Sequence, residues 1–275
     1  MKVLKRKTMG RSISFILLLF LSLSAFAQEP VNQTDVQGRK QGFWQKRDAA
    51  GKLLYEGTFK DDRPAGEMKR FHPNGKIKAI LVFSDKSDSA SAQIFDEKGK
   101  LTAKGWYLGQ KKVGEWSNFT EGRLISTENY TDGQKTGVSK RYYQTGELLD
   151  ETTWLNNLQE GLYRAYDKQG NKYIECMYRN GKINGWYVSF YPNGGMETET
   201  FYKDNLRHGN SKYYDGEGKL CYTLEYEEGI LLNPEVLDSI QKIQFDELEK
   251  NKGKVVDPEQ FMADPAQYIL KDRNK

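Results

Sequence analysis

The sequence predicts an all-β repeat protein: an elongated, single-layer antiparallel sheet of about eight stacked β-hairpins, with a short C-terminal helical cap. Glycine, or alanine once, recurs at steps of 24, 24, 24, 23, 24, 24 and 24 residues, and a turn glycine follows each start by nine residues, or eight in the fourth unit. Such a fixed period indicates a repeat architecture. The starts are Gly42, Gly66, Ala90, Gly114, Gly137, Gly161, Gly185 and Gly209.

Residues 185–208 are the clearest unit and show why each unit is expected to form a hairpin. The turn is Tyr191-Pro192-Asn193-Gly194, in which proline suits the first corner and glycine the left-handed exit. In the fourth unit this turn is one residue tighter, at Glu121-Gly122. The polar segment 84–92 lacks the usual opening and predicts a longer or more mobile loop.

An aromatic residue lies at position 17 of every unit, counted from the opening glycine as position 0, or at position 16 in the shortened unit. Residues two apart share one face of a strand, so we expect the leucines at position 11 and these aromatics on one apolar face. Position 14 then lies on a solvated face with glutamates such as Glu151 and Glu175. The aromatics are Phe59, Phe83, Tyr107, Tyr130, Trp154, Tyr178, Tyr202 and Tyr226.

The two ends differ from the repeats. Residues 1–27 are expected to be a secretory signal peptide: a basic start, an apolar run and Ala25-Phe26-Ala27 as cleavage site. Residues 28–41 are then a flexible lead-in, 42–232 the eight repeats and 233–275 a helical segment, starting at Asn233-Pro234 with a second start at Asp257-Pro258. We expect an exported protein, periplasmic, on the cell surface or secreted, without a transmembrane anchor after cleavage.

Charge excludes one class of partner. Of the 42 Lys and Arg residues, five lie within 1–27, which leaves 37 against 38 Asp and Glu. A nucleic-acid partner would need a surplus of basic residues along one face, so none is expected. Cys176 and Cys221 lie two repeats apart on opposite phases of their strands, and we expect two free thiols.

Catalytic chemistry is not indicated. The two histidines, His72 and His208, are expected in turns of different repeats, and no zinc-spaced cluster, nucleophile elbow or phosphate loop occurs. We therefore expect no enzyme activity, catalytic residue, metal or cofactor.

The repeat units, such as Gly-Glu-Met-Lys-Arg-Phe-His-Pro-Asn-Gly-Lys from Gly66 and Gly-Trp-Tyr-Val-Ser-Phe-Tyr-Pro-Asn-Gly from Gly185, resemble the MORN repeat variants of bacteria over residues 42–232. The resemblance implies an elongated antiparallel sheet that acts as a binding scaffold. Bacterial members are often described as antitoxin-like proteins that neutralise a partner protein.

The aromatic residues have two interpretations, as core or as a binding platform. Trp44, Trp116, Trp186 and Tyr187 are the candidate binding surface, because exposed rings seat partner anchors or stack on sugars. We expect an exported, non-enzymatic scaffold that binds another protein, antitoxin-like or in the envelope. The alternatives are a glycan- or cell-wall-binding module and a structural envelope element without a discrete ligand.

Overall fold

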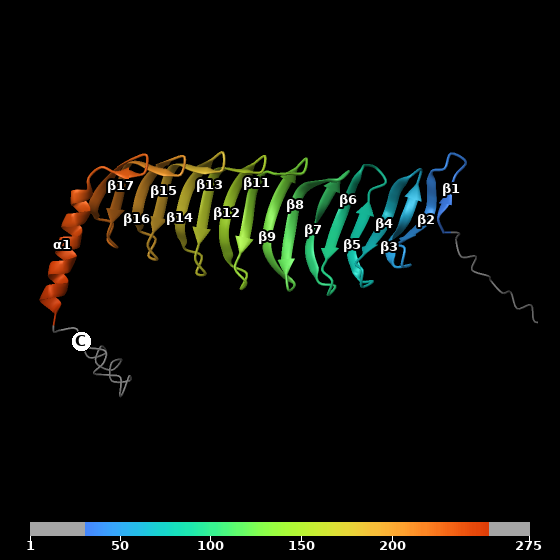
Figure 1. The fold of residues 1–275 in the computed structure, drawn as a ribbon, viewed down its shortest axis with the longest axis horizontal. Coiled ribbons are helices and arrows are strands. Elements are labelled where there is room, and N and C mark those ends of the chain that lie inside the picture. Colours follow the sequence, from blue (N-terminus) through green and yellow to red (C-terminus); the bar gives the residue numbers. More distant parts are fainter. Residues whose placement is uncertain (1–30, 253–275) are drawn as a thin grey trace, which may run out of the picture.

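The computed structural model describes residues 31–252, which form one open antiparallel sheet and one helix (Figure 1). The predicted signal peptide and second helix start lie outside these residues. The elements are β1 Gln33–Thr34, β2 Lys40–Arg47, β3 Leu53–Lys60, β4 Arg63–Phe71, β5 Ile77–Phe83, β6 Ser89–Phe95, β7 Leu101–Leu108, β8 Lys111–Thr120, β9 Arg123–Thr131, β10 Gln134–Lys135, β11 Gly137–Tyr142, β12 Leu148–Leu155, β13 Leu158–Tyr166, β14 Lys172–Arg179, β15 Lys182–Phe190, β16 Met196–Lys203, β17 Leu206–Tyr214, β18 Leu220–Glu227, β19 Ile230–Leu231 and α1 Pro234–Asn251.

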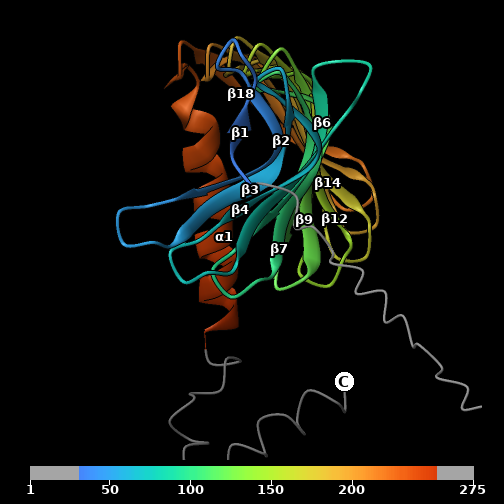
Figure 2. The same cartoon turned by 90° about the vertical axis from the view of Figure 1, so that its right-hand side faces the viewer.

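The strands pair in the order of the sequence, so the sheet grows along one axis as the chain proceeds. Sixteen long strands, β2 to β9 and β11 to β18, make the eight predicted hairpins. Seen after a 90° turn, they form one curved layer (Figure 2). The fold class predicted from the period is confirmed. The sheet begins earlier than expected, because β1 pairs with β2 inside the segment predicted to be a lead-in.

Two kinds of turn alternate along the chain. Within a unit, the turn after β15 ends at Gly194 with φ 83°, and the pairing shifts by one residue between Ser189 and Phe190. Between units, a two-residue turn places both central residues in the left-handed region, as at Asn156 and Asn157 (φ 51° and 68°). The fourth unit uses this shorter form inside the hairpin at Glu121-Gly122, as its length predicted.

The shift in pairing corrects the predicted distribution of side chains. Because the residue at position 12 is bulged out of the second strand, position 11 turns to the face that carries position 14, where it lies opposite position 5. Tyr166 at position 5 donates to Glu151 (3.1 Å), and Lys172 at position 11 pairs with Glu175 (2.9 Å). The expectation that positions 11 and 17 share a face was therefore wrong. We call the face with positions 2, 15 and 17 face A, and the face with positions 1, 3, 5, 11, 14 and 16 face B.

Face A holds the closely packed core, in which large and small side chains alternate across neighbouring strands. Tyr187 lies opposite Cys176 on one side and Thr200 on the other. Trp116 lies over Gly105, where an added Cβ would come within 2.3 Å of the indole ring. The central row, positions 2 and 15 in alternation, is Trp44, Gly57, Met68, Leu81, Ala92, Gly105, Trp116, Glu128, Ser139, Thr152, Tyr163, Cys176, Tyr187, Thr200, Ser211 and Leu224.

Face B carries paired charges along its centre. Arg164 pairs with Glu175 at 2.9 Å, and Lys212 pairs with Glu199 at 3.2 Å. These glutamates are half-buried, with side-chain exposures of 30% and 25%. The interpretation of position 14 as a solvated site was therefore incomplete, because position 5 aromatics and neighbouring cations partly cover it.

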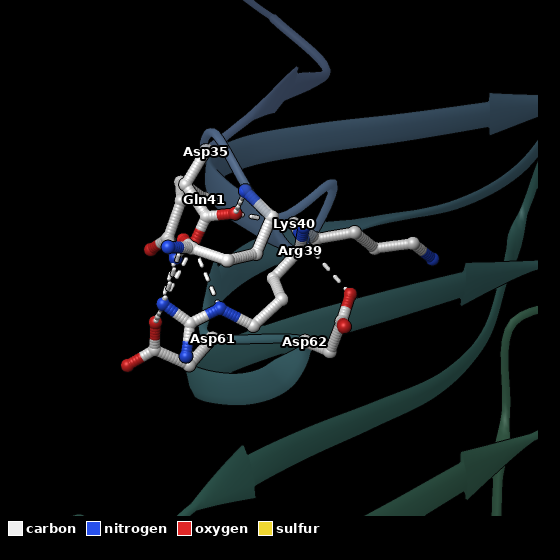
Figure 3. A network of polar contacts seen from close by, with 7 residues as sticks. Asp35, Arg39, Lys40, Gln41, Asp61 and Asp62 are labelled. Carbon is white, nitrogen blue, oxygen red and sulfur yellow. Dashed lines mark hydrogen bonds and ion pairs between the residues drawn. The ribbon is translucent and has the colours of Figure 1, made fainter.

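Hydrogen bonds between successive inter-unit turns hold the hairpins in register along the side of the sheet on which these turns lie. At the first junction, Asp62 N–H donates to the Lys40 carbonyl (3.2 Å), and Lys40 N–H donates to Asp62 Oδ1 (2.8 Å) (Figure 3). The backbone bond recurs where Gly109, Gly133, Asn157, Gly181, Asn205 and Gly229 donate to Asp88, Lys112, Lys135, Gln159, Ile183 and Arg207. We call this bond the turn tie.

The junction at residues 84–88 is the exception among the described residues. Lys86 N–H, which by its spacing would donate to Pro64, donates to Ser84 Oγ instead (3.2 Å). The predicted loop is therefore shorter than 84–92, since β6 starts at Ser89 and both Ala90 and Ala92 are buried.

The C-terminal helix continues from the last strand. The Asn233 side chain pairs with β18, accepting from Glu225 N–H (2.8 Å) and donating to the Thr223 carbonyl (3.1 Å). This covers part of the strand's free edge. Beyond the first turns, α1 leaves the sheet, and Ile243 and Phe245 are exposed.

Candidate binding surfaces

The four residues predicted to form a binding surface lie on two faces. Trp44, Trp116 and Tyr187 occupy position 2 on face A, whereas Trp186 occupies position 1 on face B. Trp44 and Tyr187 are half-buried, Trp116 has no exposed surface, and Trp186 is 50% exposed. The structure therefore does not bring the four together, and Trp186 alone among them presents an open ring.

Trp116 is packed as a core residue. Its ring meets Tyr107 edge-on at 5.0 Å between centroids, its Nε1 donates to the Trp106 carbonyl (3.1 Å), and Lys112 Nζ lies 4.3 Å from the ring centroid. Burial lowers the pKa of Lys112 below its ordinary value. No part of the indole is left to meet a ligand in this arrangement.

Cations also cover other aromatics of face A. Lys40 Nζ lies 4.8 Å from the Phe59 centroid, and Lys135 Nζ lies 4.5 Å from that of Trp154. Lys135 also pairs with Glu128 at 2.6 Å. Burial opposes ionisation of Glu128, but hydrogen bonds from Lys135 and Tyr130 hold its pKa below the usual value. These contacts indicate that Phe59 and Trp154 stabilise the sheet, because neighbouring cations already cover their rings.

The most open apolar surface around a predicted residue is the Trp186 patch, which we define as Leu162, Met177, Trp186 and Phe201 on face B. Trp186 and Phe201 are cross-strand partners with ring centroids 5.3 Å apart and planes at 79°. Met177 is 40% exposed and lies opposite Leu162. Sequence reasoning missed Met177 and Phe201, although their shared position 16 faces position 1 across each hairpin.

The histidines and cysteines have structural surroundings. His72 Nε2 lies 2.9 Å from the Phe95 carbonyl and so joins neighbouring turns. His208 was expected in a turn, but it lies within β17, and its Nδ1 is 3.7 Å from Glu227 Oε1. Cys176 is buried and Cys221 exposed, both free, and burial raises the pKa of Cys176 to about 11.

Residues 31–252 contain no group of three or more His, Cys, Asp or Glu side chains placed to hold a metal ion. Among the helices in this part of the chain, none combines the length and the apolar character needed to cross a bilayer.

Two solved structures are distantly similar to the chain. A structure titled "Crystal structure of GtfA/B complex" is 12% identical, with 33% of this chain and 18% of that chain covered and a TM-score of 0.25. "Crystal Structure of TarM" is 15% identical, with 47% and 22% covered and a TM-score of 0.22. The chain thus spans about a fifth of each of these structures. No curated protein matches.

The family comparison agrees with the repeat pattern. The model described as "MORN repeat variant" matches residues 65–85, 135–156, 184–204 and 207–228. Each match covers most of the two paired strands of one hairpin, in phase with the period: β4 and β5, β11 and β12, β15 and β16, and β17 and β18. Such repeats are commonly modules that bind proteins or membranes, and they suggest a non-enzymatic scaffold. The chain therefore contains repeats of the MORN repeat variant family at these four segments.

Proposed function

We propose that the chain is an exported, non-enzymatic scaffold that binds a partner protein through face B, with the Trp186 patch as its centre. The observation that carries this proposal is the half-exposed Trp186, held edge-on against Phe201 beside the exposed Met177. Tryptophan and methionine are enriched in protein interfaces, and an anchored ring loses little conformational entropy on binding.

The surroundings of the patch suit a protein interface. The paired charges Arg164–Glu175 and Lys212–Glu199 flank its row on the same face and supply a polar rim. Because each charge already has a partner, docking does not require an isolated charge to be buried.

The test compares the full chain with Trp186→Ala in crosslinking and capture from envelope extracts, followed by affinity measurement on the recovered protein. We expect one dominant partner and at least tenfold weaker binding by the variant. Trp106→Ala is the matched control, because Trp106 is 52% exposed on the same face but far along the sheet, and it should bind normally. Equal loss in both variants, or no partner for the unmutated chain, would refute the proposal.

A glycan-binding module is the second candidate, favoured by the same open ring, since aromatic faces also stack on sugars. If the unmutated chain sediments with cell-wall polysaccharide and Trp186→Ala does not, the glycan-binding function replaces the protein-binding proposal.

Export rests on the predicted signal peptide. Mature protein in the envelope or medium, starting at residue 28, supports it, whereas uncleaved protein in the cytoplasm contradicts it.

A further inference from the structure

A large hollow lies on face A near the N-terminal end of the sheet, away from the Trp186 patch. Its volume is about 1620 Å³, and β4, β5 and the loop 84–88 form most of its lining. The apolar part of its lining, which we call the floor, combines the small residues Ala65 and Ala79 with Leu81, Phe83 and Ile94.

The hollow occurs where the turn tie is absent. Elsewhere the tie holds each inter-unit turn against the preceding one, but Lys86 donates within its own loop. The loop is also longer than the two-residue turns, because it spans residues 84–88 between β5 and β6. Small floor residues and a loop without its tie together leave the space open.

Positive charge surrounds the hollow. Its lining includes Arg39, Lys60, Arg63, Arg70, Lys78 and Lys86, against the three carboxylates Asp61, Asp85 and Asp88. Arg39 is neutralised by Asp61 (3.0 Å), and Arg63 approaches Asp88 only to 3.9 Å with both side chains largely exposed. Within residues 31–252, Arg70 and Lys78 have no carboxylate partner and both are exposed. The hollow thus carries cations that are free to pair with an anionic ligand.

We propose that this hollow binds an extended acidic segment of the partner protein, an inference that rests on the proposed function. An extended peptide directs alternate side chains to opposite sides. Aliphatic side chains would then pack on Ala79 and Leu81 while carboxylates pair with Arg70 and Lys78 at the rim. A recessed floor is out of reach of a flat membrane surface, and the apolar floor gives a purely ionic polymer nothing to pack on.

The experiment measures binding of a fluorescein-labelled dodecapeptide of alternating glutamate and valine to the full chain, with a glutamine–valine peptide as neutral probe. Arg70→Glu with Lys78→Glu should weaken binding of the acidic peptide at least tenfold. Lys203→Glu with Lys219→Glu makes the same charge change at exposed sites far from the hollow and should leave binding within about twofold. Circular dichroism of all variants controls for folding.

Several outcomes would overturn the inference: equal affinity for both peptides, equal weakening by both double variants, or tighter binding of polygalacturonate or phosphatidylserine vesicles than of the peptide. The two proposals fail separately. If Arg70→Glu with Lys78→Glu still captures the partner at full affinity, the inference about the hollow is wrong while the proposed function stands. If the unmutated chain binds the peptide but captures no partner, the proposed function is the one refuted.

Discussion

The contact between Gly105 and Trp116 makes the sharpest test of how the hairpins pack. A Cβ at residue 105 would lie 2.3 Å from Trp116 Cδ2 and 2.5 Å from Cε2, far inside contact distance. Trp116 is fully buried and cannot swing into solvent without leaving its place against Tyr107. Gly105→Ala must therefore displace the indole or the backbone of β7.

The expected cost follows from two effects. Overpacking a closely packed site costs about 1–3 kcal/mol, and losing the hydrogen bond from Trp116 Nε1 to the Trp106 carbonyl costs about 1 kcal/mol more. We predict a loss of about 2–4 kcal/mol in the free energy of unfolding, or a fall in Tm of roughly 5–15 °C.

The assay is urea and thermal unfolding followed by circular dichroism and tryptophan fluorescence. Gly216→Ala is the matched control, because no atom lies within 4 Å of its added Cβ and its φ is not positive, so it should be neutral or slightly stabilising. Replacing Trp116 by leucine should make the Gly105→Ala change much less costly, since the clash is removed. If the free energy of unfolding of Gly105→Ala lies within about 0.5 kcal/mol of that of the unmutated chain, the packing described is refuted.

Three further predictions concern other features. Asn157→Gly keeps the left-handed turn but removes the hydrogen bond that Asn157 Oδ1 accepts from Lys135 N–H, so the free energy of unfolding should fall by about 1 kcal/mol. Asn156→Gly is the control and should change the free energy of unfolding by about a few tenths of a kcal/mol. Equal effects of the two variants would argue against this hydrogen bond. Buried Cys176 should react with a thiol reagent far more slowly than exposed Cys221, and two equally fast thiols would contradict its placement. Burial, with Asp150 nearby, raises the pKa of Tyr163 to about 12. The stability that the neutral phenol contributes is therefore complete below about pH 10 and is lost as the pH rises towards 12. Tyr163→Phe should lose less stability at alkaline pH than the unmutated chain, and an unchanged dependence of stability on pH would contradict this.

The sequence predicted the fold well because its period is set by turns. Glycines such as Gly194 are needed where φ is positive, so their spacing gives the number of hairpins directly. The shortened turn at Gly122 also followed from a count.

Facing directions were harder to predict. The pairing shift, as between Ser189 and Phe190, reverses the face of position 11, and counting by twos along one strand does not reveal it. The role of Trp116 was missed for a related reason. Its burial depends on Gly105 eleven residues earlier, and that match becomes visible only once strands β7 and β8 are placed side by side.

The lost turn tie at residues 84–88 could be predicted only in part. The polar segment predicted a departure from the repeat. The cationic character of the hollow depends on Arg70 and Lys78, which lie on the paired strands β4 and β5 of one hairpin. Ordinary propensities carry no information on which charged side chains of two paired strands converge beside a loop.

The bulged repeat places Trp116 in the packed core of face A and leaves Trp186 open on face B. Acrylamide quenching of two variants tests this division most directly, one keeping only Trp116 and the other only Trp186, with the remaining tryptophans replaced by phenylalanine. Trp116 should be blue-shifted and quenched several-fold less than Trp186, whose exposed fractions are 0% and 50%. Equal quenching of the two rings would contradict the account.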